Sequence, residues 1–216
     1  MALQLRTPAG RGVGSSSESL SFISDYNDFL PGVSMKKFYY GDDHTDTTTK
    51  KLLQENGWKV NLGNTTINTI KVSGASFTKE IDIDFDITIE GERLIGGDCL
   101  AQVKFDTFEG ASSEVVAFPI VKVVHYDGTT ETVLATMQGK EENSVSASKE
   151  FTHSLKGTVT KKNFKKGDIL RITIEIWAKE DMDEVDNAVY LFHDGGLVNE
   201  TGDSFIYIPF IRLDEY

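Results

Sequence analysis

Cysteine is almost absent from this chain, because Cys99 is the only one among 216 residues. A single cysteine cannot form a disulfide within the chain, and it cannot supply a cysteine-based zinc site. Cys99 lies in the strand-like run 98–105. We therefore interpret it as a small core residue and not as a reactive thiol.

Long hydrophobic runs are also missing. No stretch approaches the roughly 18 consecutive apolar residues that a membrane-spanning helix needs. Residues 1–17 contain Arg6 and Arg11 but no apolar centre of the kind found in secretory signals. We therefore expect no membrane partner, and a protein that is made and folded in a cytoplasm.

Positive charge is in the minority. The chain has 22 lysines and arginines against 34 aspartates and glutamates, so its formal net charge is −12. Phosphate groups repel such a chain, and we expect no nucleic-acid partner. Hydrophobic residues make up 39% of the chain and include 13 phenylalanines, which is enough for a substantial core in one large β-domain.

Hydrophobic periodicity of two predicts β-strands through most of the chain. Between residues 80 and 90, apolar side chains at odd positions alternate with acidic residues and a threonine, which is typical of a half-buried strand. Tyr126-Asp127-Gly128-Thr129 predicts a hairpin turn. Pro119 is expected to bend its strand or place it at an edge. Further strands are expected at 35–40, 99–105, 115–126, 130–137, 151–160, 168–178, 189–193 and 204–213.

The expected fold is all-β, an antiparallel β-sandwich or jelly roll. Residues 47–56, which contain Leu52 and Leu53 and are followed by Gly57, predict one short helix. Residues 1–21 are rich in glycine and serine and predict an extended N-terminal arm. Residues 22–216 then form a single sandwich domain.

No motif for catalysis, metal binding or a cofactor is present. The sequence lacks the nucleophile elbow, the phosphate-binding loop and the dinucleotide-binding loop. The alternating Asp82, Asp84 and Asp86 are interpreted as a solvated acidic strand face, since neighbouring carboxylates on such a face lie about 6.6 Å apart. We therefore expect no enzyme, with no catalytic residues, no metal ligands and no cofactor.

The stretch 149–171 is basic in an otherwise acidic chain, with seven basic against two acidic residues. One interpretation is a hairpin whose lysines keep it soluble and prevent strand pairing at the edge. The other is a patch that docks an acidic surface on an identical or different neighbour, with the face 82–86 or the segment 180–186 as the acidic side. The predicted partner-binding residues of this stretch are Lys161, Lys162, Lys165 and Lys166.

Two further sets of candidate binding residues lie outside this stretch. The N-terminal arm could hold a partner through Leu3, Leu5, Arg6 and Arg11. Alternatively, Trp58 and Trp177 could stack on sugar rings, which is typical of a carbohydrate-binding or adhesin-type sandwich.

Four segments of the C-terminal half resemble small β-sandwich virion proteins of tailed phages. They are Phe164-Lys165-Lys166-Gly167-Asp168-Ile169-Leu170-Arg171, the strand 172–177, Leu191-Phe192-His193-Asp194 and Ile208-Pro209-Phe210. The resemblance covers residues 160–213. It implies a non-enzymatic structural subunit of the capsid, neck or tail. It also implies that the chain binds other virion proteins and itself as a homo-oligomer, and that it is located in the virion. A carbohydrate-binding or adhesin-type module is the alternative.

Overall fold

The computed structural model describes residues 33–43, 46–54, 66–71, 75–108, 114–145, 149–180, 188–192 and 204–211. Within these ranges the regular structure is entirely β, and no helix occurs. The strands are β1 (Val33–Asp43), β2 (Asp46–Gln54), β3 (Thr66–Lys71), β4 (Thr78–Thr88), β5 (Arg93–Phe108), β6 (Glu114–Tyr126), β7 (Glu131–Gln138), β8 (Glu142–Val145), β9 (Lys149–Phe164), β10 (Ile169–Glu180), β11 (Ala188–Phe192) and β12 (Phe205–Ile211).

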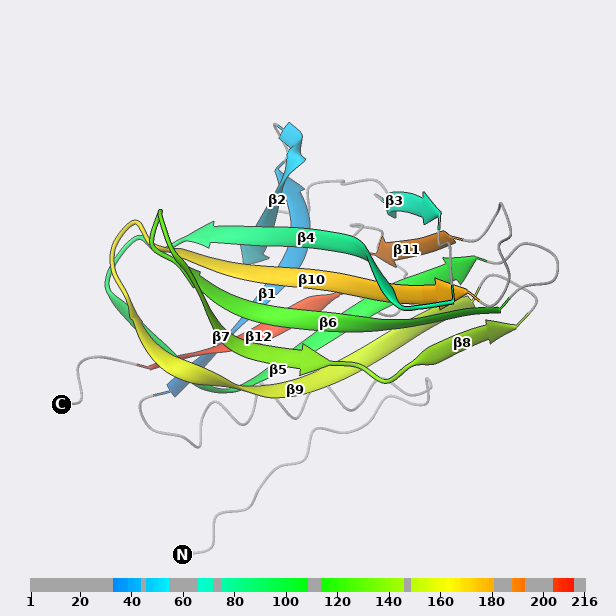
Figure 1. Cartoon of the computed structure of the whole chain (residues 1–216). Helices are drawn as coiled ribbons and strands as arrows, with labels where there is room; N and C mark the ends of the chain where they lie inside the picture. Colours follow the sequence, from blue (N-terminus) through cyan, green and yellow to red (C-terminus); the bar gives the residue numbers. More distant parts are fainter. Residues whose placement is uncertain are drawn as a thin grey trace, which may run out of the picture. The chain divides into compact units, whose positions relative to one another are not determined.

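The strands form two antiparallel sheets, which confirms the predicted β-sandwich (Figure 1). In sheet A, the central strand β5 pairs with β9 on one side and with both β12 and β11 on the other. Beyond β12, the sheet continues with β1, which pairs with β12, and then β2, which pairs with β1. Beyond β11, it continues with β3. In sheet B, β10 lies between β4 and β6, and β6 also pairs with β7 and β8. A single parallel bridge between β2 and β4 joins the sheets, with Lys51 opposite Asp86.

Alternation along the strands places the core between the sheets. On β10, Ile172, Ile174 and Ile176 are fully buried on the inner face, whereas Arg171 and Trp177 on the outer face are only half-buried. The predicted alternation over residues 80–90 is confirmed in β4. Aromatic side chains fill the space between the sheets, and the largest buried ones are Phe38, Tyr40, Phe85, Phe105 and Phe164.

The short helix predicted over residues 47–56 is wrong, because Asp46–Gln54 forms strand β2. Three consecutive threonines, Thr47 to Thr49, are β-branched, and such residues favour strands over helices. Antiparallel pairing with β1 reinforces that preference, with Leu52 opposite Tyr40. Tertiary pairing therefore outweighs the weak helix signal from the two leucines and the glycine at 57.

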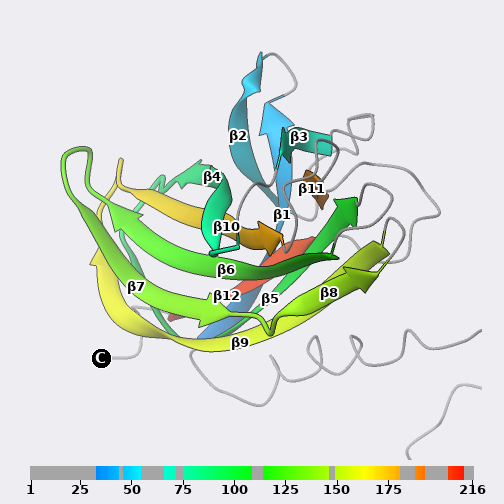
Figure 2. The same cartoon turned by 45° about the vertical axis from the view of Figure 1, so that its right-hand side comes forward.

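Pro119 lies in β6, which is not an edge strand, at the point where the partner of β6 changes. Pairing with β7 ends at Ile120 opposite Gln138, and pairing with β8 begins at Ala117 opposite Glu142. Between them, the Gly139 amide donates to the Pro119 carbonyl at 2.8 Å. A residue without an N–H group is tolerated here because no ladder hydrogen bond needs one. Figure 2 shows β7 and β8 following one another along β6.

Several predicted features lie outside the described residues. These are the arm over residues 1–21, its boundary with the domain at residue 22, and Trp58. In the described part, no helix is long and apolar enough to cross a membrane.

Cys99 is 2% exposed in the core, in agreement with its interpretation as a core residue. Its Sγ lies 3.6 Å from Sδ of Met137, and burial raises its pKa to about 11. Because the thiolate is the reactive form, we expect the folded protein to resist a thiol reagent at neutral pH and the urea-unfolded protein to react at once. Titration with a chromogenic disulfide reagent measures both. Rapid and complete labelling of the folded protein would contradict the buried position.

Candidate functional site

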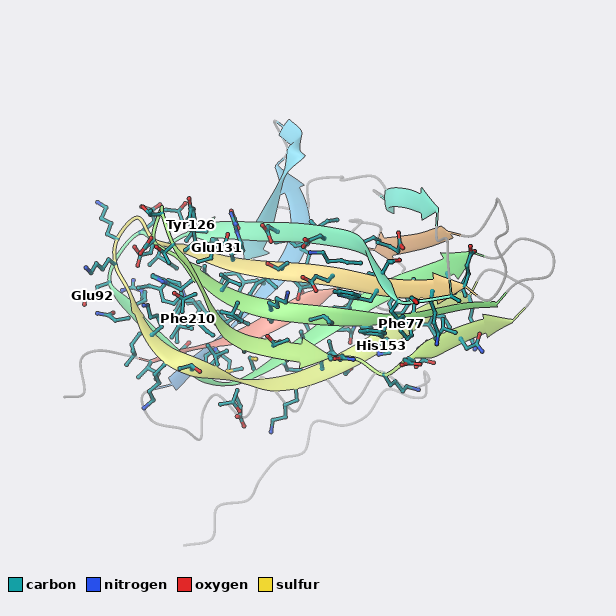
Figure 3. The ribbon with its side chains drawn as sticks, in the orientation of Figure 1. Phe77, Glu92, Tyr126, Glu131, His153 and Phe210 are labelled. Atoms are coloured by element: carbon teal, nitrogen blue, oxygen red, sulfur yellow. The ribbon has the colours of Figure 1, made fainter. Side chains whose placement is uncertain are left out.

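Three turns gather at one end of the sandwich, which we call the turn end. They are residues 89–92 between β4 and β5, 127–130 between β6 and β7, and 165–168 between β9 and β10. Figure 3 shows Glu92, Tyr126 and Glu131 at this end, with Phe77 and His153 at the opposite end. The hairpin predicted at 126–129 is therefore confirmed.

Backbone hydrogen bonds fasten the turn between β9 and β10 to the end of β4. The Gly167 amide donates to the Ile89 carbonyl at 2.8 Å, and the Ile89 amide donates to the Asp168 carbonyl at 2.8 Å. Within the turn, the Asp168 amide donates to the Lys165 carbonyl at 3.1 Å. Gly167 has a φ of 93°, a conformation that side chains with a Cβ rarely adopt. The turn is therefore held in one conformation.

A pair of side chains joins this turn to β6: Asp168 of the turn, which is partly buried, and His125 of β6, which is buried. His125 Nε2 is 2.7 Å from Asp168 Oδ2, and the two side chains are 5% and 12% exposed. The His125 ring stands perpendicular to the ring of Phe164, with the centroids 4.5 Å apart. Asp168 Oδ2 also accepts the Lys165 amide at 2.8 Å. The hydrogen bonds from His125 and then from the Lys165 amide lower the pKa of Asp168.

The arrangement of this pair is not that of a hydrolytic triad. In a triad, the second imidazole nitrogen faces a nucleophilic hydroxyl or thiol. His125 Nδ1 is buried and has no hydrogen-bond partner among the described residues. The pair can therefore hold the turn in place, and none of the residues that the structure describes offers it a nucleophile.

The lysine cluster, which we define as Lys161, Lys162, Lys165 and Lys166, occupies the end of β9 and the adjoining turn. Lys162 is half-buried and the other three are exposed. None of the four ammonium groups has a carboxylate within 4.0 Å or lies over an aromatic ring of the described residues. Every other lysine whose side chain the structure describes has such a partner: Lys36, Lys37, Lys79, Lys104, Lys122, Lys140, Lys149, Lys156 and Lys179.

The rest of the predicted basic stretch is used within the chain. Lys156 pairs with Asp98 at 3.2 Å, and Lys149 lies over the ring of Phe151. Arg171 projects from the outer face of sheet B. The stretch 149–171 therefore does not form one basic surface, and only the lysine cluster remains of it.

The acidic face predicted at residues 82–86 is largely neutralised by its own neighbours. Arg171 binds Asp86 through two hydrogen bonds of 2.8 Å and lies 3.1 Å from Asp84. The same guanidinium contacts Glu131 and lies over the ring of Tyr126. Hydrogen bonding to Asp86 is the main reason that the pKa of Arg171 is raised. This face is therefore an ion-pair network across the sheet, in which Asp82, Asp84 and Asp86 each already have a basic partner within the chain.

Trp177 lies half-buried on the same outer face. Its Nε1 donates to Glu175 Oε2 at 2.9 Å, while Lys122 binds the other carboxylate oxygen at 2.6 Å. Burial alone would raise the pKa of Glu175, but the hydrogen bonds from Lys122 and Trp177 hold it below the usual value. The indole N–H is thus already bonded within the chain, so only the ring face of Trp177 could meet a ligand.

The remaining predicted binding residues are not placed by the structure, because Leu3, Leu5, Arg6, Arg11 and Trp58 lie outside the described residues. Among the residues that are described, no three histidine, cysteine or acidic side chains are grouped so that they could hold a metal ion. The pair His125 and Asp168 was not predicted from the sequence. No spacing rule joins residues 43 positions apart, and the only available signal was that each is adjacent to a turn.

Comparisons with known proteins give structural neighbours but no family. No family model matches the sequence, and no curated protein matches it. Similar solved structures include a CocE/NonD family hydrolase from Staphylococcus aureus, with a TM-score of 0.48 and 12% identity over 84% of this chain. A second structure of that hydrolase has a TM-score of 0.49 and 10% identity over 85% of this chain. An aminopeptidase from the marine sediment archaeon Thaumarchaeota archaeon has a TM-score of 0.47 and 10% identity over 83% of this chain.

The chain spans 37% of the length of each of these proteins, and at 10–12% identity the similarity concerns the fold. These neighbours correct two predictions. The phage structural subunit is wrong, because the similar structures are of a hydrolase and an aminopeptidase and not of virion proteins. The expectation that the chain is not an enzyme is overturned by the same finding. The strand and turn patterns behind the phage prediction specify packing, which many unrelated functions share. The expectation of no enzyme rested on missing short motifs, which do not reveal residues that only folding brings together.

Proposed function

We propose that this chain binds an acidic segment of a partner protein through the lysine cluster at the turn end. One observation carries the proposal: among the lysines with described side chains, these four are the only ones without a carboxylate or ring partner on another described residue. Their positions along the chain are also close together. Surface charges that a fold does not use internally are available to a partner.

The electrostatic setting favours an acidic protein as the partner. The whole chain carries a net charge of −12, so a polyanion approaching any other side is repelled. A local group of lysines on an acidic body can attract and orient a short acidic segment. A long nucleic acid would have to lie against the acidic surfaces as well, which makes it the less favourable ligand.

The proposal is tested by the binding of a fluorescein-labelled oligoglutamate peptide, followed by fluorescence anisotropy at low salt. We expect the protein to bind the peptide, and K161Q/K162Q/K165Q/K166Q to weaken the binding by about tenfold or more, since each exposed ion pair contributes about 0.2–1 kcal/mol. Binding should also weaken as salt screens the charges. The matched control is K140Q/K156Q, which removes two lysines that already have acidic partners.

Three results would overturn the proposal. The first is that the wild-type protein does not bind the peptide, and the second is that the cluster and control variants lose the same affinity. The third is that a single-stranded oligonucleotide of equal charge binds more tightly than the peptide. If the lysines only keep the hairpin soluble, the cluster variant should aggregate more readily while the wild-type protein shows no binding.

A further inference from the structure

We infer that Asp168 and His125 are positioning residues for the lysine cluster, which fix the turn carrying Lys165 and Lys166 in its binding conformation. The inference rests on the proposed binding function and extends it to residues that do not touch the partner. It follows from the two hydrogen bonds that Asp168 accepts, one from the turn and one from β6. One of its carboxylate oxygens holds the turn itself, through the Lys165 amide at 2.8 Å, and also the buried His125 of β6 at 2.7 Å.

The pair couples the exposed turn to the core of the sandwich. His125 is 4% exposed and packs against Phe164, the fully buried last residue of β9. Lys165 follows Phe164 directly in the chain. The lysines are thus attached on one side to a core residue and on the other to a carboxylate anchored in β6. This leaves the backbone of the turn little freedom.

The hydrogen-bonding pattern assigns the proton between the two side chains. An ionised carboxylate only accepts hydrogen bonds, so His125 Nε2 is the donor to Asp168. His125 Nδ1 is buried without a partner in the part of the chain that the structure describes. An N–H group at that position would be left unsatisfied at a cost, so the imidazole holds its proton on Nε2. This tautomer can be observed by NMR.

Fixing the turn matters because a flexible segment must be ordered when a partner binds. That ordering weakens the affinity, and a segment that is already fixed avoids the loss. The expected consequence of breaking the pair is weaker binding of an acidic partner without loss of the fold. The lysines themselves remain present and charged.

The chain provides a matched control at the same end of the sandwich. Asp127 holds the neighbouring turn between β6 and β7 in a similar way, because its Oδ1 accepts the amides of Thr129 at 2.9 Å and Thr130 at 2.7 Å. That turn contains no lysine. Asp127→Ala therefore loosens a turn that carries no lysine and removes one negative charge at the same end, as Asp168→Ala does.

The experiment measures oligoglutamate binding to Asp168→Ala, Asp168→Asn, Asp127→Ala and K165Q/K166Q in the full chain, with melting temperatures recorded for each. We expect Asp168→Ala to bind about fivefold more weakly, and Asp168→Asn, which keeps an oxygen acceptor, to lose about twofold or less. Asp127→Ala should bind as the wild type does. Long-range 1H–15N spectra should show the His125 proton on Nε2 in the wild-type protein.

The outcomes separate the inference from the proposed function. If K165Q/K166Q binds like the wild type, the proposed function fails. If K165Q/K166Q binds weakly but Asp168→Ala binds like the wild type, the function stands and the positioning role is overturned. Equal losses in Asp168→Ala and Asp127→Ala would also overturn it, because they would reflect general loosening of this end. A His125 proton on Nδ1 would contradict the hydrogen bond on which the inference depends.

Discussion

Replacing Phe85 by alanine is expected to lower the free energy of unfolding by about 3–5 kcal/mol, the range for removing a fully buried aromatic side chain. Phe85 projects from β4 of sheet B and is 0% exposed. Its ring lies 5.0 Å from the ring of Tyr40, which projects from β1 of sheet A. The contact therefore joins the two sheets, and its loss leaves a cavity between them.

Urea unfolding followed by tryptophan fluorescence measures this change. The control is Val133→Ala on β7, because Val133 is 55% exposed. Removing surface methyl groups there should change stability by no more than about 0.5 kcal/mol. A loss below about 1 kcal/mol for Phe85→Ala would show that the sheets do not pack face to face at this position.

Gly96→Ala is expected to destabilise the fold by about 1–3 kcal/mol, or to displace β9 from β5, because there is no room for a side chain. An added Cβ at Gly96 would lie 2.7 Å from Cα and 2.6 Å from Cγ of Lys161. Here the register between β5 and β9 shifts, with Ile95 opposite Lys162 and Gly97 opposite Val159. Backbone atoms on both strands are involved, so the clash cannot be relieved by turning a side chain.

Gly91→Ala is the matched control, since the only atom near its added Cβ is the end of the Arg93 side chain at 3.8 Å. We expect this variant to unfold at nearly the same urea concentration as the wild type, or to be slightly more stable. Gly96→Ala, in contrast, should shift the midpoint to lower urea. If both variants behave alike, the close approach of β5 and β9 is absent in solution.

The sequence predicts most of the sandwich because its strongest pattern, the alternation of apolar and polar residues, also determines which side chains are buried between the sheets. A period of two over residues 80–90 and 169–177 tells which face of β4 and β10 meets the core. The weaker signals were less reliable. The helix over 47–56 rested on leucine spacing and a terminal glycine, and pairing with β1 outweighed both. The short strands β3 and β8 carry too few residues for their periodicity to be seen.

The candidate site is only half predictable for a related reason. Charge counting finds the lysine cluster, because it detects a local excess of one sign along the chain. It cannot tell which cations the fold will pair, and Arg171 turned out to belong to the acidic face of sheet B. His125 and Asp168 meet only through the alignment of β6 with β10, which places Leu170 opposite His125. The phage assignment failed because strand and turn patterns carry no information on function.

The change of partner at Pro119 has a consequence for self-association. Exposed strand edges can recruit strands from other molecules, and long, regular edges are the most dangerous. Along this side of sheet B, the outer strand is divided into β7, which ends at Gln138, and β8, which begins at Glu142. Within the described residues, an incoming strand therefore meets two short templates instead of one as long as β6. We therefore expect the interruption at Gly139 to hinder the pairing of strands from other molecules along this edge.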